Sequence, residues 1–246
     1  MKFKKIFTLL ITLGLIITHS CFQKIYALDT SSSSELILKI EEDLKSKGTS
    51  VEKELTELKN ENLNDNIDNA VLDDLKEDFN NFSLEKKESI YSVNVKRASS
   101  IGNTINHGPV VAAVIAWFSA SGYKLSAELL THMRSNKKIN SSYTPKNGYV
   151  IKSSRTIKRI ANATKTKGSD VMQNIGSTAE KDCYYAIHKF NFTKPSAKSK
   201  TVNVSDRYDF ANSGISSIAN FAITAMYSAQ LSGYLKPFYT KITVRM

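Results

Sequence analysis

The charged side chains of this 246-residue chain are divided between two segments of opposite sign, and this division limits how the chain can fold. Residues 28–95 contain 17 Asp and Glu against 8 Lys, a net charge of −9. Residues 96–246 contain 22 Lys and Arg against 6 Asp and Glu, a net charge of +16. Such asymmetry points to an interaction region. We therefore expect three parts: residues 1–27, an acidic segment 28–97 and a basic domain 98–246.

Residues 1–27 have the pattern of a cleavable secretory signal peptide. Three lysines precede an apolar run over 6–18, and Ala27 is the small residue at the expected cleavage site. The run is shorter than the about 20 residues that span a bilayer. The alternatives are an uncleaved anchor and lipidation at Cys21, where the usual Leu three residues upstream is missing. Cleavage would leave Cys183 as the one cysteine of a secreted, extracellular protein, so a hydrophobic core must hold its fold.

The acidic segment is predicted to consist of short helices. Apolar residues recur at helical steps in three stretches, over 36–44, 51–58 and 67–79. Each apolar stripe is one residue wide, so we do not expect these helices to be stable alone. One interpretation is a solvated spacer. The other is a pro-segment that covers the basic half through charge complementarity and is removed by cleavage after Arg97.

The basic domain has the pattern of an α+β fold with a small antiparallel sheet. The predicted elements, in chain order, are a helical hairpin over 110–135, strands over 184–193 and 201–205, a helix over 216–232 and a last strand over 238–244. The stretch 214–235 carries no charge. We interpret it as a core helix rather than a membrane span, because Ser, Thr, Asn and Gln recur along it.

The cluster Asp206-Arg207-Tyr208-Asp209-Phe210, placed just after a strand, is the strongest candidate for catalysis. Asp206 and Asp209 would act as acid/base or cation-binding carboxylates, with a divalent ion such as Mg²⁺, and Tyr208 would position a phosphate-bearing substrate. The alternative is a tight turn in which both carboxylates accept backbone hydrogen bonds. The sequence carries no catalytic fingerprint and no pattern of a dedicated metal site.

Three further cations, Arg155, Lys158 and Arg159, would share one helical face and are candidates for binding an anion. Cys183 and His188 would lie on opposite faces of one strand, so we do not expect them to form a nucleophile–base pair.

The predicted strands followed by D-x-Y-D-F resemble the end of colicin-M-like toxins, which cleave the lipid-linked peptidoglycan precursor with help from a metal. The resemblance covers about 30 residues and implies catalytic roles for Asp206, Tyr208 and Asp209. In that family a His-Arg pair follows shortly after the second Asp, whereas residues 210–216 here read FANSGIS.

The order of signal peptide, acidic region and basic domain is similar to that of secreted Gram-positive bacteriocin precursors, which implies an immunity protein as a partner.

Two functions follow as expectations. The first is a secreted antibacterial protein whose basic part acts on a target cell envelope, attracted to anionic membrane, teichoic acid or a lipid-linked wall precursor. The second is a non-enzymatic secreted protein that binds cell-wall polymer or another surface partner through Arg155, Lys158 and Arg159. Nucleic acid is not an expected partner, because the chain has no recognised binding motif and is predicted to be exported.

Overall fold

The computed structural model describes residues 30–61, 66–92, 107–174, 176–211 and 217–246. The predicted signal peptide with Ala27, and the predicted cleavage site after Arg97, lie outside the described residues. The elements are α2 (Thr30–Ser46), α3 (Val51–Glu61), α4 (Asn66–Ser92), α5 (His107–Ala120), α6 (Lys124–Ser135), β1 (Ser142–Tyr143), η1 (Lys146–Ser153), α7 (Arg155–Asn162), β2 (Lys167–Val171), α8 (Thr178–Ala186), β3 (Lys189–Thr193), β4 (Thr201–Tyr208), α9 (Ile218–Leu231) and β5 (Phe238–Arg245). The predicted α+β class is confirmed.

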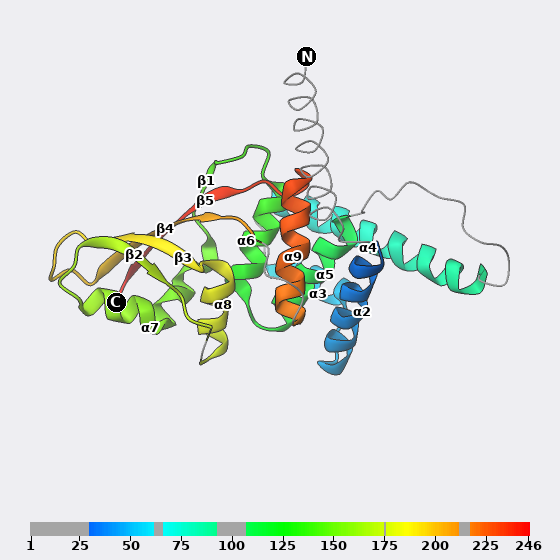
Figure 1. Ribbon diagram of the computed structural model, residues 1–246, viewed down its shortest axis with the longest axis horizontal. Coiled ribbons are helices and arrows are strands. Elements are labelled where there is room, and N and C mark those ends of the chain that lie inside the picture. Colours follow the sequence, from blue (N-terminus) through cyan, green and yellow to red (C-terminus); the bar gives the residue numbers. More distant parts are fainter. Residues whose placement is uncertain (1–29, 62–65, 93–106, 175, 212–216) are drawn as a thin grey trace, which may run out of the picture.

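The described elements form two ends (Figure 1). Helices α2–α6 and α9 make a helical end, and the sheet with η1, α7 and α8 makes a sheet end. One cluster of buried apolar side chains includes residues from both ends. The acidic helices therefore belong to the same core as the sheet.

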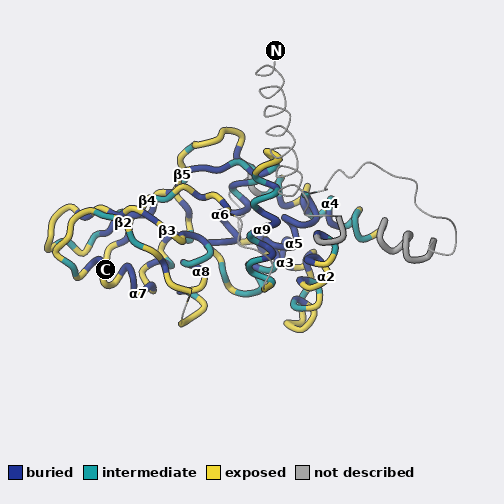
Figure 2. The backbone as a smooth tube through the Cα atoms, in the orientation of Figure 1, coloured by how far each residue is buried: buried dark blue, intermediate teal, exposed yellow. Residues whose placement is uncertain are grey.

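Helix α5 lies at the centre of the helical end (Figure 2). Its sequence is apolar on nearly all faces, and residues 108–116 are all buried. Such a helix needs neighbours on every side. Helices α2, α3 and α4 supply them, together with α6 and α9. The approach of α4 is close, because a Cβ atom at Gly108 would collide with the side chain of Asp78.

The acidic helices dock on α5 through apolar side chains rather than through charge. Each presents its predicted stripe to the core, and the buried residues include Leu36, Leu55 and Leu75. The ion pair that joins these helices to the basic half within the described residues is Lys124–Glu61, at 3.0 Å, with both side chains about half exposed. An exposed pair of this kind contributes about 1 kcal/mol or less. Burial of the apolar stripes therefore dominates the docking.

The predicted hairpin is confirmed as α5 and α6. Gly122 ends α5 with a φ of +73°, a left-handed conformation that favours glycine. The N-terminus of α6 is held by a residue distant in the sequence. The buried Asp182 carboxylate of α8 accepts hydrogen bonds from the backbone N–H groups of Leu125 and Ser126 and from the Ser126 hydroxyl. Helix α8 thus provides the cap that α6 lacks locally.

The sheet has five strands in the order β1-β5-β4-β3-β2. All pairs are antiparallel except β1 with β5, so the predicted small antiparallel sheet is mixed at one edge. The predicted strand over 184–193 is wrong in its first part, because Tyr184, Tyr185 and Ala186 belong to α8. The alternation of β4 and β5 gives the sheet an inner face that is buried and an outer face that is polar.

Helix α9 confirms the core interpretation of the uncharged stretch. Phe221, Ala225, Met226 and Ala229 are buried, and α9 contacts α2 and α5. Within the part of the chain that the structure describes, no helix has the length and apolar character needed to cross a membrane.

Two more buried charges join segments that are distant in the sequence. Glu128 on α6 accepts four hydrogen bonds from the segment 143–147, where β1 ends and η1 begins. Lys194, which follows β3, points inward and is 5% exposed. Its ammonium group donates to four backbone carbonyls at 2.5–3.2 Å, three of which lie around the C-terminus of α7. A cation at this end of a helix is favoured by the helix dipole.

Candidate functional site

The predicted catalytic cluster lies within and directly after β4 rather than after a shorter strand. Alternation along β4 places Asp206 and Tyr208 on the inner face, beside Val204. Arg207 lies on the opposite, outer face of the strand and is exposed. Asp209 follows the strand and is also exposed. Its charge raises the pKa of Asp206, so the two carboxylates remain near each other at the end of β4.

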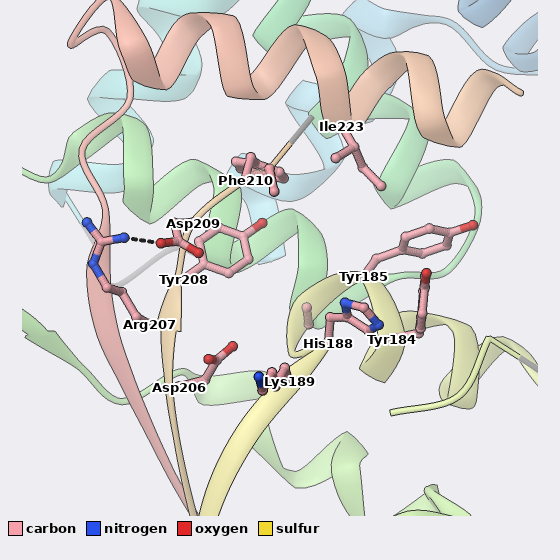
Figure 3. A pocket seen from close by; sticks show the side chains of 12 residues that line it. Tyr184, Tyr185, His188, Lys189, Asp206, Arg207, Tyr208, Asp209, Phe210 and Ile223 are labelled. Carbon is pink, nitrogen blue, oxygen red and sulfur yellow. Dashed lines mark hydrogen bonds and ion pairs between the residues drawn. The ribbon is translucent and has the colours of Figure 1, made fainter. Parts of the chain in front are cut away.

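The end of β4 forms one wall of a pocket of about 250 Å³, which we call the β4 pocket (Figure 3). The opposite wall comes from α8 and the start of β3, and Ile223 of α9 closes one side. The lining residues are Tyr184, Tyr185, Ala186, His188, Lys189, Asp206, Arg207, Tyr208, Asp209, Phe210, Ala211 and Ile223. All three predicted catalytic residues therefore line one pocket, together with aromatic and basic side chains that sequence analysis had not connected to them.

Burial determines the direction of the pKa shifts of two polar groups in this pocket, Asp206 and Tyr208. Burial raises the pKa of Asp206 to about 7, although a backbone hydrogen bond from Arg207 lowers it, and the charge of Asp209 raises it further. Tyr208 is 3% exposed, and burial also raises its pKa. Its hydroxyl has no hydrogen-bond partner within the part of the chain that the structure describes. Figure 3 shows this hydroxyl pointing toward the side of the pocket that carries Tyr185.

The two carboxylates have different surroundings, because Asp206 is half-buried and Asp209 is exposed. Asp209 makes an ion pair with Arg207, and both are about two-fifths exposed. No group of three or more His, Cys, Asp or Glu side chains that could hold a metal ion occurs among the described residues. The residues of the β4 pocket supply hydrogen-bond donors and acceptors beside aromatic rings, an arrangement suited to binding a small polar ligand.

Replacing Asp206 by Asn is expected to raise the free energy of unfolding at pH 8 by about 1–2 kcal/mol and to have little effect near pH 4. The folded-state pKa of about 7 lies above the ordinary value of 3.8. The folded protein therefore binds more protons than the unfolded chain between these values, and stability is lost as the pH rises through them. Asn does not ionise, so the variant does not lose stability in this way as the pH rises. Urea unfolding at several pH values measures the difference in the free energy of unfolding between the two proteins.

Asp209→Asn is the matched control, because Asp209 is exposed and paired with Arg207. It should change stability by less than 1 kcal/mol at either pH. A pH-independent effect of Asp206→Asn would contradict the raised pKa.

Cys183 and His188 do not form a catalytic pair, but the predicted reason is wrong. They are not on one strand: Cys183 is in α8, and His188 precedes β3. Cys183 is fully buried, and burial raises the pKa of its thiol to about 12. His188 lies at the β4 pocket, with its ring 4.9 Å from that of Tyr184.

The predicted anion-binding residues lie on α7 and are exposed, as the helical spacing required. Arg155 makes an ion pair with the buried Glu180, and Arg159 makes one with Asp170. Among the described residues Lys158 has no ion pair. Two of the three charges are therefore already neutralised, so this group is a weaker anion site than its sequence indicated.

The outer face of the sheet carries the larger unpaired positive charge. Its exposed side chains come from alternate positions of β2, β3, β4 and β5 and include no carboxylate. Lys167, Lys189, Lys241 and Arg245 lie there without an ion pair among the described residues, and Tyr239 is 43% exposed. We call these four cations the basic face.

Polar side chains connect the strands across the basic face. Hydrogen bonds run from Ser169 to Asn191, from Asn203 to Thr193 and from Thr243 to Asn203. A hollow of about 290 Å³ lies between Lys189, Arg207 and Tyr239. The alternation in residues 239–245, which read Tyr-Thr-Lys-Ile-Thr-Val-Arg, is the sequence signal that could have located this face.

No protein family matches the sequence, and no curated protein and no solved structure shows significant similarity to the chain. We therefore infer function from the geometry of the sheet end.

Proposed function

We propose that this chain is an exported antibacterial protein that binds a phosphate-bearing polymer of the target cell envelope through the basic face. The basic face is the observation that carries the proposal. Its four cations lie on the sheet without an ion pair to any residue that the structure describes, and the outer-facing residues of β2–β5 include no carboxylate. A surface of this kind attracts polyanions and holds them in a salt-dependent way.

The distribution of charge over the fold supports an extended anionic partner. Residues 136–209 and 236–246, which contain the sheet end, hold 18 Lys and Arg against 5 Asp and Glu, a net charge of +13. Of those five acids, Asp182 is fully buried and Glu180 nearly so. Asp170, Glu180 and Asp209 are paired with arginine. The acidic helices lie at the other end of the protein (Figure 1), so they leave the sheet end open to a partner.

The apolar helices of the helical end are buried, as expected for a secreted protein that stays folded until it reaches its target. Helices α5 and α9 are the apolar segments that would act on a membrane, and both are buried in the core. The acidic helices cover α5 through apolar contacts, which salt does not weaken. If the acidic segment is a cover, burial of its apolar stripes rather than charge complementarity holds it on α5.

Neutralising the basic face is expected to weaken binding to teichoic acid by about 100-fold at low salt. The test variant is Lys189→Gln, Lys241→Gln and Arg245→Gln together, and each cation near an anionic surface contributes about 1 kcal/mol. The matched control replaces Arg155, Lys158 and Arg159 by Gln. Because two of these are already ion-paired, a loss of less than tenfold is expected. Titration calorimetry at two salt concentrations measures both effects.

Equal losses in the two variants would contradict a role for the basic face. Addition of the protein to growing Gram-positive cells then separates the two functions. Growth inhibition that disappears in the basic-face variant supports the antibacterial protein. Binding to walls without inhibition supports the alternative, a non-enzymatic wall-binding protein. Anionic vesicles in place of teichoic acid show whether a lipid headgroup serves as well as the polymer.

A further inference from the structure

The β4 pocket adjoins the basic face but differs from it in chemistry. Lys189, Asp206 and Arg207 line both the pocket and the hollow on the outer face, so the two sites share one wall. The hollow is bordered by cations, small polar side chains and Tyr239, with Asp206 on the shared wall. The pocket has aromatic walls, from Tyr184, Tyr185 and Phe210, and polar groups between them.

The polar groups of the β4 pocket are complementary to a ligand that both donates and accepts hydrogen bonds. The Tyr208 hydroxyl is buried and has no partner among the described residues, which costs about 1–3 kcal/mol unless a ligand or water forms a hydrogen bond with it. Asp206 and His188 lie on the same pocket lining. Because the pKa of Asp206 is raised to about 7, its carboxyl is partly uncharged near neutral pH and can then donate as well as accept.

The size of the pocket limits the ligand to a single ring. Its volume of about 250 Å³ is below the roughly 300–1,000 Å³ of pockets that enclose drug-sized molecules. A fatty acyl chain would leave the Tyr208 hydroxyl unsatisfied, and a free anion would meet the carboxylates of Asp206 and Asp209. A sugar ring offers hydroxyls to the polar groups and an apolar face to the aromatic side chains.

We propose that the β4 pocket binds one pyranose ring carried by the anionic polymer that lies on the basic face. The ring packs against Tyr184 and Tyr185, and its hydroxyls pair with Asp206 and Tyr208. A phosphate next to the ring reaches Lys189 on the shared wall. This inference rests on the proposed function, because the polymer must first bind the basic face. The pocket would then select polymers that carry a sugar.

The test compares poly(glycerol phosphate) teichoic acid that is bare with the same polymer carrying glucose. The unmodified protein is expected to bind the glucosylated polymer at least tenfold more tightly. Tyr208→Phe should reduce this ratio to less than threefold without changing the affinity for the bare polymer. Because the ring of Tyr208 remains and an unpaired hydroxyl is removed, the melting temperature should rise or stay the same. Tyr184→Ala should also lower the ratio.

The control replaces Lys241 and Arg245 by Gln and keeps Lys189. Neither Lys241 nor Arg245 lines the pocket, so this variant should weaken binding to both polymers and keep their ratio. Equal affinities of the unmodified protein for the two polymers would overturn the sugar pocket and leave the proposed function standing. A ratio that is unchanged in Tyr208→Phe would also overturn it. Absence of binding to either polymer would overturn the proposed function itself.

Discussion

Replacing Leu75 by alanine is expected to lower the free energy of unfolding of the whole protein by about 3 kcal/mol. Leu75 lies on α4, in the acidic segment, and is fully buried. Truncation of a buried leucine removes its burial and leaves a cavity, which costs about 2–5 kcal/mol. Because α4 packs on α5 within one core cluster, the loss should appear in the transition of the entire fold.

The measurement is urea unfolding followed by fluorescence of Trp117 and by far-ultraviolet circular dichroism. Trp117 is the one tryptophan of the chain and lies on α5, so its fluorescence reports on the covered helix. Leu84→Ala is the matched control on the same helix, since Leu84 is 57% exposed. It should change stability by less than about 0.5 kcal/mol.

The pair of variants decides between a spacer and a cover. If α4 were a solvated spacer, Leu75→Ala would leave the Trp117 transition where it is. Coincident shifts of both signals would show that residues outside the basic half stabilise it. A protein cleaved after Arg97 would then keep its acidic helices bound even in high salt, because apolar burial holds them.

Replacing Lys194 by methionine is expected to cost about 3 kcal/mol and to lower the melting temperature by about 6 to 12 °C. Methionine is close in volume to lysine but cannot donate hydrogen bonds. Four carbonyl oxygens, including those of Ile160, Ala161 and Ala163, would lose the ammonium group. Some of these would remain buried without a partner, which is the costly outcome.

Lys198→Met is the control for Lys194→Met, because Lys198 lies four residues further on and is exposed. It removes the same charge and should change the melting temperature by no more than about 2 °C. If Lys194 belonged to the polymer-binding surface, its variant would instead lose affinity and keep its stability. Equal melting temperatures of the two variants would therefore contradict a structural role for Lys194.

Part of the candidate site could be predicted from sequence, since Asp206, Tyr208 and Asp209 do line one pocket. Their geometry could not, because β4 runs through Tyr208, so that Asp206 lies within the strand and Asp209 lies after it, paired with Arg207. The aromatic wall was missed because residues 184–193 alternate like a strand. Ser177 and Glu180 form a capping box that begins α8, and this S-x-x-E pattern is the signal that could have corrected the prediction.

The sequence by itself determined which faces must be buried. Periodicity marked the stripes of the acidic helices, the apolar hairpin and the last strand, because burial of apolar area depends only on residue type and spacing. It also determined the separation of charge between the halves. Neither the apolar stripes nor the charge separation specifies which element packs against which, since an apolar stripe can be buried against any apolar neighbour.

Only the tertiary structure decided which surfaces meet. It placed the acidic helices on α5, paired β2 with β3 although the residues of β2 read KGSDV, and turned Lys194 inward. These choices depend on contacts between residues far apart in the chain: backbone hydrogen bonds for β2 and four distant carbonyls for Lys194. Such contacts leave no local pattern. Alternation within β5 indicates which of its side chains face outward, but the cations of β2, β3 and β5 and the walls of the β4 pocket come together only when the strands lie side by side.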